Sequence, residues 1–130
     1  MKPDGTLILS TPNVNRLENI TKMIAGVNIY DPYSGHGPYG RHNREYNKHE
    51  LFQLLDHMGF TIEQMFSSDV HENHAGLHYP LSEVYKYVET IPNTEYDLGQ
   101  YIFITAKNDR PAVAGKPSWL FRSYPDDEMV

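Results

Sequence analysis

The sequence lacks cysteine, an excess of basic residues and any long apolar run. Without cysteine, neither a disulfide framework nor a thiolate metal site can form, and a reducing compartment is expected. The 11 Lys and Arg against 17 Asp and Glu give a net charge of -6. They form no basic cluster, which argues against general nucleic-acid binding. The first apolar run is too brief for a signal peptide or for the roughly 20 residues of a membrane span, so we expect a soluble, cytoplasmic protein.

The length and composition favour one compact domain. The chain has 130 residues, of which 39% are hydrophobic and 22% charged. This composition is somewhat more polar than the globular average, so some segments are expected to be loosely ordered. Beyond Lys107, three prolines and an acidic run at 126–128 interrupt any periodicity. Residues 108–130 are therefore predicted to form an extended or poorly ordered tail.

Three short strands are predicted, over Thr6–Ser10, Phe60–Phe66 and Tyr101–Ala106. The apolar residues of the first strand are continuous and do not alternate with polar ones. Such runs are typical of strands in α/β sheets, so both faces of Thr6–Ser10 are expected to be covered. A strand of this kind needs a neighbour on each side, and its position at the start of the chain indicates a truncated fold.

Helical spacing of apolar residues predicts helices over Val14–Ile24, over Lys48–Met58 and after Pro80. The second is the clearest. Asn47 and Glu50 form a capping box at its start, and a glycine follows it as the expected stop.

Residues 26–41 contain four glycines, two prolines and three tyrosines, which is too irregular for a helix or a core strand. Connections of this length inside a compact domain are often lids or binding loops. The tyrosines either close over a ligand or pack on their own domain. Residues 14–46 are thus predicted to be a helix followed by a lid-like loop.

The order strand, helix, long loop, helix, strand, helix, strand is that of an α/β fragment, and two motifs are more specific. Residues 2–13, KPDGTLILSTPN, resemble the turn into the fifth strand and the loop leaving it in class I S-adenosylmethionine-dependent methyltransferases. Residues 42–60, HNREYNKHELFQLLDHMGF, are similar to that family's last major helix and sixth strand. Tyr101–Lys107 resembles the seventh strand.

The resemblance covers residues 1–107 and implies a partial Rossmann-like fold, the C-terminal part of a methyltransferase domain. The family's glycine-rich loop, ribose-binding acidic residue and aspartate segment before strand four all precede the part that this chain matches. S-adenosylmethionine is therefore not expected to bind this chain alone, which would be inactive without a donor-binding half. The glycines of residues 35–40 follow no strand and open no helix, so they are not a nucleotide loop.

The resemblance also implies a sheet in which strand five lies between strands four and seven, with strand six outermost. Thr6–Ser10 would then have an unpaired edge. We expect a homo-oligomer formed through this edge, or binding of a separate donor-binding half. The tail aromatics Trp119, Phe121 and Tyr124 either dock on the surface left bare by the missing half or remain loose.

Candidate site residues follow from the same reading. Ligands of open α/β sheets bind at the carboxyl ends of strands, so Thr11 and Asn13 could contact the methyl acceptor, or could simply end the strand in a turn. His42 is a candidate catalytic base and Arg44 a candidate clamp for an anionic acceptor. The candidate substrate-binding residues are Thr11, Asn13, Tyr30, Tyr33, Tyr39, Arg44, Glu45 and Tyr46.

Each of these residues also has a structural interpretation. Arg44 and Glu45 could pair on the surface, with His42 forming hydrogen bonds within the loop. Tyr46 could pack as a hydrophobic staple before the capped helix.

Three histidines, His71, His74 and His78, have a spacing that places metal ligands on one face of a helix. The segment has a weak helical pattern and no evident carboxylate support, so a solvated loop is favoured and no metal site is assigned. Two functions remain: the acceptor-side portion of a methyltransferase, or a non-enzymatic binding or assembly module derived from one. The residues do not specify the methyl acceptor.

Overall fold

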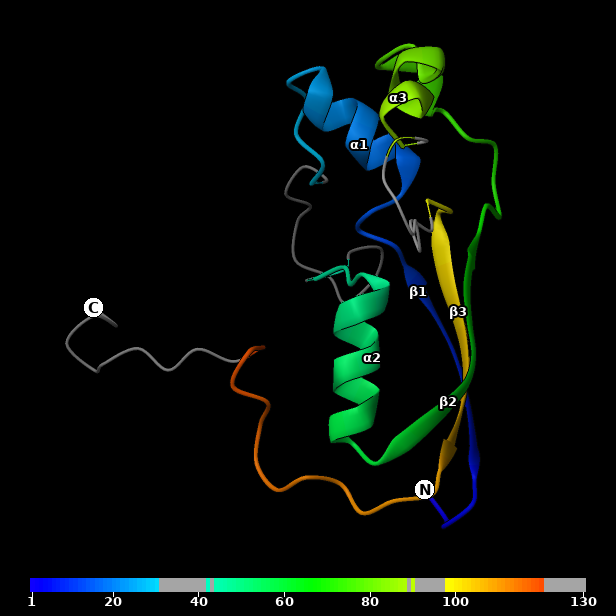
Figure 1. Cartoon of the computed structure of the whole chain (residues 1–130), viewed down its shortest axis with the longest axis vertical. Coiled ribbons are helices and arrows are strands. Elements are labelled where there is room, and N and C mark those ends of the chain that lie inside the picture. The colour runs from blue at the N-terminus through cyan, green and yellow to red at the C-terminus, as the bar shows by residue number, and fades with distance from the viewer. Residues whose placement is uncertain (31–41, 43, 89, 91–97, 121–130) are drawn as a thin grey trace, which may run out of the picture.

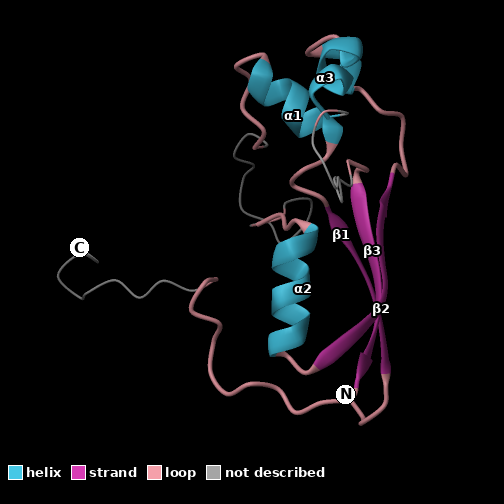
Figure 2. Ribbon diagram, viewed as in Figure 1, coloured by secondary structure: helices cyan, strands magenta, loops and turns pink. Residues whose placement is uncertain are grey.

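The computed structural model describes residues 1–30, 42, 44–88, 90 and 98–120. They form a mixed α/β arrangement of three strands and three α-helices (Figure 1; Figure 2). In chain order the elements are β1 (Thr6–Pro12), α1 (Leu17–Ile24), α2 (Lys48–His57), β2 (Phe60–Ser68), the 3-10 turn η1 (Ala75–Leu77), α3 (Leu81–Val88) and β3 (Tyr101–Asn108).

The three strands lie in the order β1-β3-β2. β3 runs antiparallel to both neighbours, so the two outer strands share a direction. Leu9 of β1 and Met65 of β2 both lie opposite Ile104 of β3. Each strand is two residues longer than the sequence pattern predicts, because pairing with β3 continues past the apolar residues.

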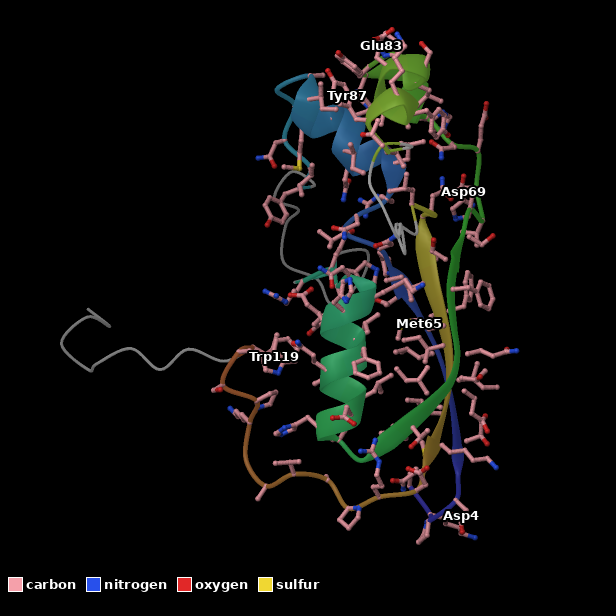
Figure 3. The ribbon with its side chains drawn as sticks, in the orientation of Figure 1. Asp4, Met65, Asp69, Glu83, Tyr87 and Trp119 are labelled. Atoms are coloured by element: carbon pink, nitrogen blue, oxygen red, sulfur yellow. The ribbon has the colours of Figure 1, made fainter. Side chains whose placement is uncertain are left out.

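α2 covers one face of this sheet (Figure 2). Its Leu51 and Leu55 pack with Ile102 and Ile104 of β3, and Met65 points toward the helix (Figure 3). Together these residues form the larger hydrophobic core.

α2 begins at the predicted Lys48 and ends at His57, one residue before the predicted Met58. The Asn47 side chain accepts a hydrogen bond of 2.9 Å from the Glu50 N–H, and the Glu50 carboxylate accepts one of 3.2 Å from the Asn47 N–H. Gly59 follows the helix with φ +84°, a conformation that favours glycine. A Cβ at this position would also lie 2.1 Å from the carbonyl oxygen of Arg110.

A second, smaller core lies beyond the end of the sheet, where α1, η1 and α3 meet (Figure 1). It is built on the buried side chains of Leu17, Ala75 and Val84. α1 begins at Leu17, later than the predicted Val14, because residues 13–16 form a turn in which the Arg16 N–H donates to the carbonyl oxygen of Asn13.

The face of the sheet opposite α2 is more exposed than the sequence predicts. Ile8 is 81% exposed and Phe66 50%, and Phe66 stacks on Phe103 with ring centroids 5.4 Å apart. The expectation that both faces of β1 are covered is therefore wrong. Side chains alternate along a strand, and α2 reaches only the side that carries Leu7 and Leu9.

The described part of the tail returns along α2 (Figure 1). The Val113 N–H donates to the carbonyl oxygen of His57 at 2.8 Å, and Arg110 pairs with Asp56 at 2.8 Å. Trp119 is 42% exposed, whereas Phe121 and Tyr124 lie outside the described residues. Among the helices that the structure describes, none is long and apolar enough to cross a membrane.

Candidate functional site

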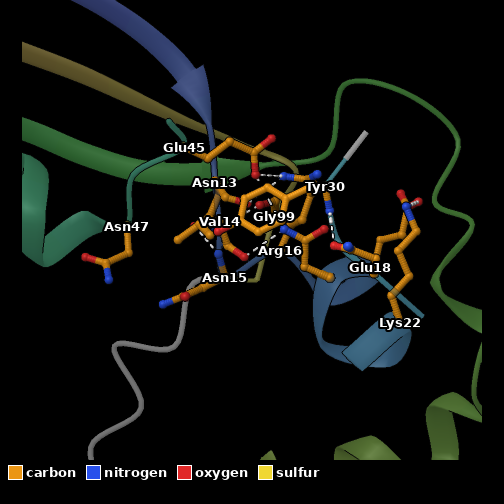
Figure 4. A network of polar contacts seen from close by, with 12 residues as sticks. Asn13, Val14, Asn15, Arg16, Glu18, Lys22, Tyr30, Glu45, Asn47 and Gly99 are labelled. Carbon is orange, nitrogen blue, oxygen red and sulfur yellow. Dashed lines mark hydrogen bonds and ion pairs between the residues drawn. The ribbon is translucent and has the colours of Figure 1, made fainter. Parts of the chain in front are cut away.

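Polar residues from two distant segments meet at the carboxyl end of β1, where Arg16 donates to the Asn13 carbonyl oxygen and Glu45 lies against Arg16 (Figure 4) and Asn19. Asn13 follows the last residue of β1, Arg16 precedes α1, Asn19 lies within α1, and Glu45 belongs to the segment before α2. We call these four residues the polar cluster.

Backbone contacts bring the two segments together. The Asn13 N–H donates to the carbonyl oxygen of Gln100 at 2.9 Å, on the side of β3. On the other side, Asn13 and Tyr46 form a parallel bridge, and the Val14 N–H donates to the Tyr46 carbonyl oxygen at 3.0 Å. The end of β1 is thus held between β3 and the segment that carries Glu45.

An ion pair links the two segments through their side chains. Arg16 Nη1 lies 2.5 Å from Glu45 Oε2 and also donates to the Asn13 carbonyl oxygen at 3.1 Å. The side chains of Arg16 and Glu45 are only 17% and 23% exposed. Because partly buried pairs are screened less than surface pairs, this contact holds the segment before α2 against the start of α1.

Asn13 is 1% exposed and connects the end of β1 to the start of β3. Its Nδ2 donates to the carbonyl oxygen of Gly99 at 2.9 Å, and its Oδ1 accepts from the Asn15 N–H at 3.0 Å. The second bond is an Asx turn, as expected of an asparagine that ends a strand. Gly99 is required here because a Cβ would lie 2.5 Å from the backbone nitrogen of Ser68.

Asn19, also 1% exposed, has the one buried polar side-chain atom without a hydrogen-bond partner in the described part of the chain. Its Nδ2 donates to the Val14 carbonyl oxygen at 2.9 Å and lies 3.5 Å from Glu45 Oε2, whereas its Oδ1 has no donor. Buried polar atoms are nearly always paired, and an unpaired one costs about 1–3 kcal/mol. The Oδ1 atom is therefore a buried hydrogen-bond acceptor without a donor among the described residues.

Arg44 and Tyr46 have structural partners. Arg44 forms an ion pair with Glu50 and lies over the Tyr46 ring, 5.5 Å from its centroid. Tyr46 packs on the same core as Leu51, as a hydrophobic staple would. The alternative pairing of Arg44 with Glu45 is wrong, because each carboxylate and guanidinium found a different partner, Glu50 for Arg44 and Arg16 for Glu45.

The remaining predicted site residues are not joined to the polar cluster by a hydrogen bond or ion pair within the described residues. Thr11 is half-buried and lies on the α2 side of the sheet, opposite Ile102. His42 is exposed. Tyr30 is 77% exposed, and its backbone N–H donates to the Asn28 side chain. Tyr33 and Tyr39, with most of the lid-like loop, lie outside the described residues.

A second polar network orders the loop that follows β2. Gln100 is 8% exposed, and its Oε1 accepts from the His71 N–H while its Nε2 donates to the Glu72 carbonyl oxygen. Asp69 (Figure 3) accepts from the Gln100 N–H at 3.0 Å. The His71 ring packs edge-on against Tyr101. Within the described ranges, no group of three or more His, Asp or Glu side chains is placed to hold a metal ion.

The charge of α1 is balanced beside the polar cluster. The hydrogen bond from Lys22 lowers the pKa of Glu18, and burial opposes this shift. The positive charges of Lys22 and Arg16 lower the pKa further. Glu18 is therefore ionised at neutral pH, and its carboxylate holds Lys22 at 2.8 Å.

Sequence reasoning identified Asn13 and Glu45 but missed Arg16 and Asn19. Both lie within the segment predicted as a helix, three and six residues after Asn13. A helix that starts just after a strand places its first turn at the strand's end, and this could have indicated that its polar residues belong to the site.

No protein-family model matches the chain, and no curated protein matches it significantly.

Proposed function

We propose that the chain is the acceptor-side portion of a class I S-adenosylmethionine-dependent methyltransferase with a partial Rossmann-like fold. The sheet order carries this proposal. The resemblance in residues 2–13, 42–60 and 101–107 implies strand five beside strand seven, with strand six outermost. β1, β3 and β2 would correspond to those strands, and the order β1-β3-β2 of the described sheet supports the proposal. The length and composition of the chain do not favour the order β1-β3-β2 over the sequential order β1-β2-β3.

The methyl acceptor would bind at the carboxyl end of β1. The unpaired Oδ1 of Asn19 would accept a hydrogen bond from a hydroxyl or amine of the acceptor, beside the carboxylate of Glu45. Arg16 holds that carboxylate in place through their ion pair. In this proposal His42 remains a candidate base, and Thr11, Tyr30, Arg44 and Tyr46 remain candidate contacts from the surrounding segments.

The methyl donor would be held by a half that the chain does not contain, so S-adenosylmethionine would act only in the intact domain. This portion would be inactive alone. A cytoplasmic setting fits the absence of cysteine.

A non-enzymatic assembly module is the second candidate. The Asn13 side chain bonds to the Gly99 carbonyl oxygen and the Asn15 N–H, and Arg16 pairs with Glu45, so these groups are satisfied without a ligand, as in a structural clamp. The exposed Ile8 of the outer strand β1 also favours a surface used for association.

Two measurements separate the candidates. Isothermal titration of the chain with S-adenosylhomocysteine is expected to give no binding, and micromolar binding would contradict the absence of a donor site. The DNA upstream of the Met1 codon is then read for an in-frame glycine-rich strand–loop–helix segment.

If such a segment is present, the longer protein is expressed and compared with the 130-residue chain. The longer protein should bind S-adenosylhomocysteine, and Asn19→Leu should weaken methyl transfer without weakening that binding. If neither the segment nor the binding is found, the assembly module is the better description.

A further inference from the structure

Among the described residues, no strand pairs with the outer edge of β1 over Thr6–Ser10. On the side of β3, the Asn13 N–H donates to the carbonyl oxygen of Gln100, the residue before β3. The Gly5 carbonyl oxygen accepts a hydrogen bond from the N–H of Asn108, the last residue of β3. Because successive residues of a strand direct their N–H and C=O groups to alternate sides, the odd-numbered residues of β1 bond to β3. The N–H and C=O groups of Thr6–Ser10 at even positions therefore point away from the sheet.

The two edges of the sheet differ in how they are protected. β2 carries a bulge between Ile62 and Gln64, and its exposed Glu63 lies 3.9 Å from Lys107. Bulges and charges of this kind prevent edge-to-edge pairing. The register of β1 is uninterrupted, the strand has no charged residue, and its one proline stands at its last position. The edge of β1 is thus suited to pair with another strand.

Both ends of β1 limit the length that is open. Asp4 has φ +59°, within a turn in which the Gly5 N–H donates to the Lys2 carbonyl oxygen. At the other end, the Tyr46 backbone occupies the outer side of Val14. Pro12 has no N–H. The three outward-facing N–H groups belong to Thr6, Ile8 and Ser10.

We propose that two copies of this chain pair their β1 strands antiparallel about a two-fold axis through Ile8. In this register Ile8 faces Ile8 of the second copy, Thr6 faces Ser10, and Leu7 faces Leu9. Apolar residues thus meet apolar residues, and hydroxyls meet hydroxyls. The three outward pairs exchange about six N–H···O bonds, and the two sheets become one of six strands with both copies of α2 on the same face.

This register matches the surroundings of the strand as well. It brings no charged residue opposite a like charge, because residues 5–12 contain none. The turn at Asp4 ends each strand before it reaches the Tyr46 segment of the other copy. A shift by one pair would place Ile8 opposite Ser10 and Thr6 opposite Pro12, which lacks the donor. The contact is short compared with interfaces of about 1,200–2,000 Å², so micromolar affinity is expected.

Sedimentation equilibrium of the whole chain from about 1 to about 500 µM tests the proposal. We expect reversible dimers. Ile8→Lys should weaken dimerisation about tenfold or more, because it removes an apolar pair and places like charges face to face. Gln64→Lys adds the same charge on the same face of the sheet at the protected edge, and should leave dimerisation unchanged.

A mixture of two variants tests the register. Ile8→Lys and Ile8→Glu should each be monomeric alone and form a heterodimer when mixed, because opposite charges then meet. Far-UV circular dichroism confirms that both variants fold. A wild-type chain that stays monomeric would overturn the proposal, and so would dimers that Ile8→Lys does not weaken. In either case the edge of β1 would be a site for a strand of another chain.

Hydrogen exchange provides a readout that needs no substitution. The N–H groups of Leu7 and Leu9 should be protected at all concentrations, because they bond to β3. Those of Ile8 and Ser10 should become protected only as dimers form. Protection of all four that does not depend on concentration would contradict pairing with a second copy.

Discussion

Asn13→Ala is expected to destabilise the protein more than any other single truncation at the end of β1. Asn13 is 1% exposed, and its amide makes one hydrogen bond to the Gly99 carbonyl oxygen and accepts one from the Asn15 N–H. The substitution removes both bonds and leaves their partners partly buried.

The magnitude follows from these two bonds. Each contributes about 0.5–1.5 kcal/mol, and a carbonyl left without a donor adds to the cost, so the free energy of unfolding should fall by about 2–4 kcal/mol. A domain of this size has a total of about 5–15 kcal/mol. The loss is therefore a large fraction of the whole stability.

Urea unfolding followed by far-UV circular dichroism measures this change. With a slope of about 2 kcal/mol per molar urea, in the middle of the usual range, the midpoint should fall by about 1–2 M. Asn15→Ala is the matched control, because Asn15 contributes only its backbone N–H, and it should change stability by less than about 0.5 kcal/mol. If the two variants unfold at the same midpoint, the contact between Asn13 and Gly99 does not hold β1 to β3.

Three further substitutions test other parts of the structure. Gly59→Ala should cost more than about 2 kcal/mol in urea unfolding, because φ is +84° and the new Cβ would meet the Arg110 carbonyl oxygen; an unchanged midpoint would contradict this contact. Glu18→Gln should lower the free energy of unfolding at pH 7 by about 0.5 kcal/mol, because it removes the ion pair with Lys22. A carboxylate whose pKa is lowered in the fold stabilises the folded state above the ordinary glutamate pKa of about 4.3. It loses this effect as the pH falls through the pKa of the folded state. The difference from wild type should therefore shrink as the pH falls below the ordinary glutamate pKa, and a difference independent of pH would refute the role of Lys22. Gln100→Ala should cost about 2–3 kcal/mol and accelerate amide exchange at His71, and normal exchange there would show that the loop is held by other contacts.

The elements of the fold were predicted well where local chemistry defines them. α2 begins at its capping box and ends at His57, two residues before Gly59, as the order of these residues indicates. The three strands were found because apolar residues with β propensity stand between turn residues. The start of α1 was misplaced by three residues, because the side chain of Asn13 forms a turn that apolar spacing does not reveal.

The site was predicted only in part. Asn13 and Glu45 were selected by a resemblance, but their partners Arg16 and Asn19 were not. Arg16 and Glu45 are separated by 29 positions, and Glu45 had an adjacent arginine as an obvious partner. Which cation it meets depends on how the backbone bridge between Asn13 and Tyr46 orients the segment, and local sequence does not encode this.

The sequence by itself determined which segments form helices and strands and where α2 begins, because caps, glycines and apolar spacing act within a few residues. The tertiary structure decided that the face of β1 that carries Ile8 stays exposed, since α2 packs only on the side of Leu7 and Leu9. It also decided that β3 lies between β1 and β2, which leaves the outer edge of β1 unpaired among the described residues. Both outcomes depend on contacts between segments far apart in the chain, whose free energy arises only when the whole sheet forms.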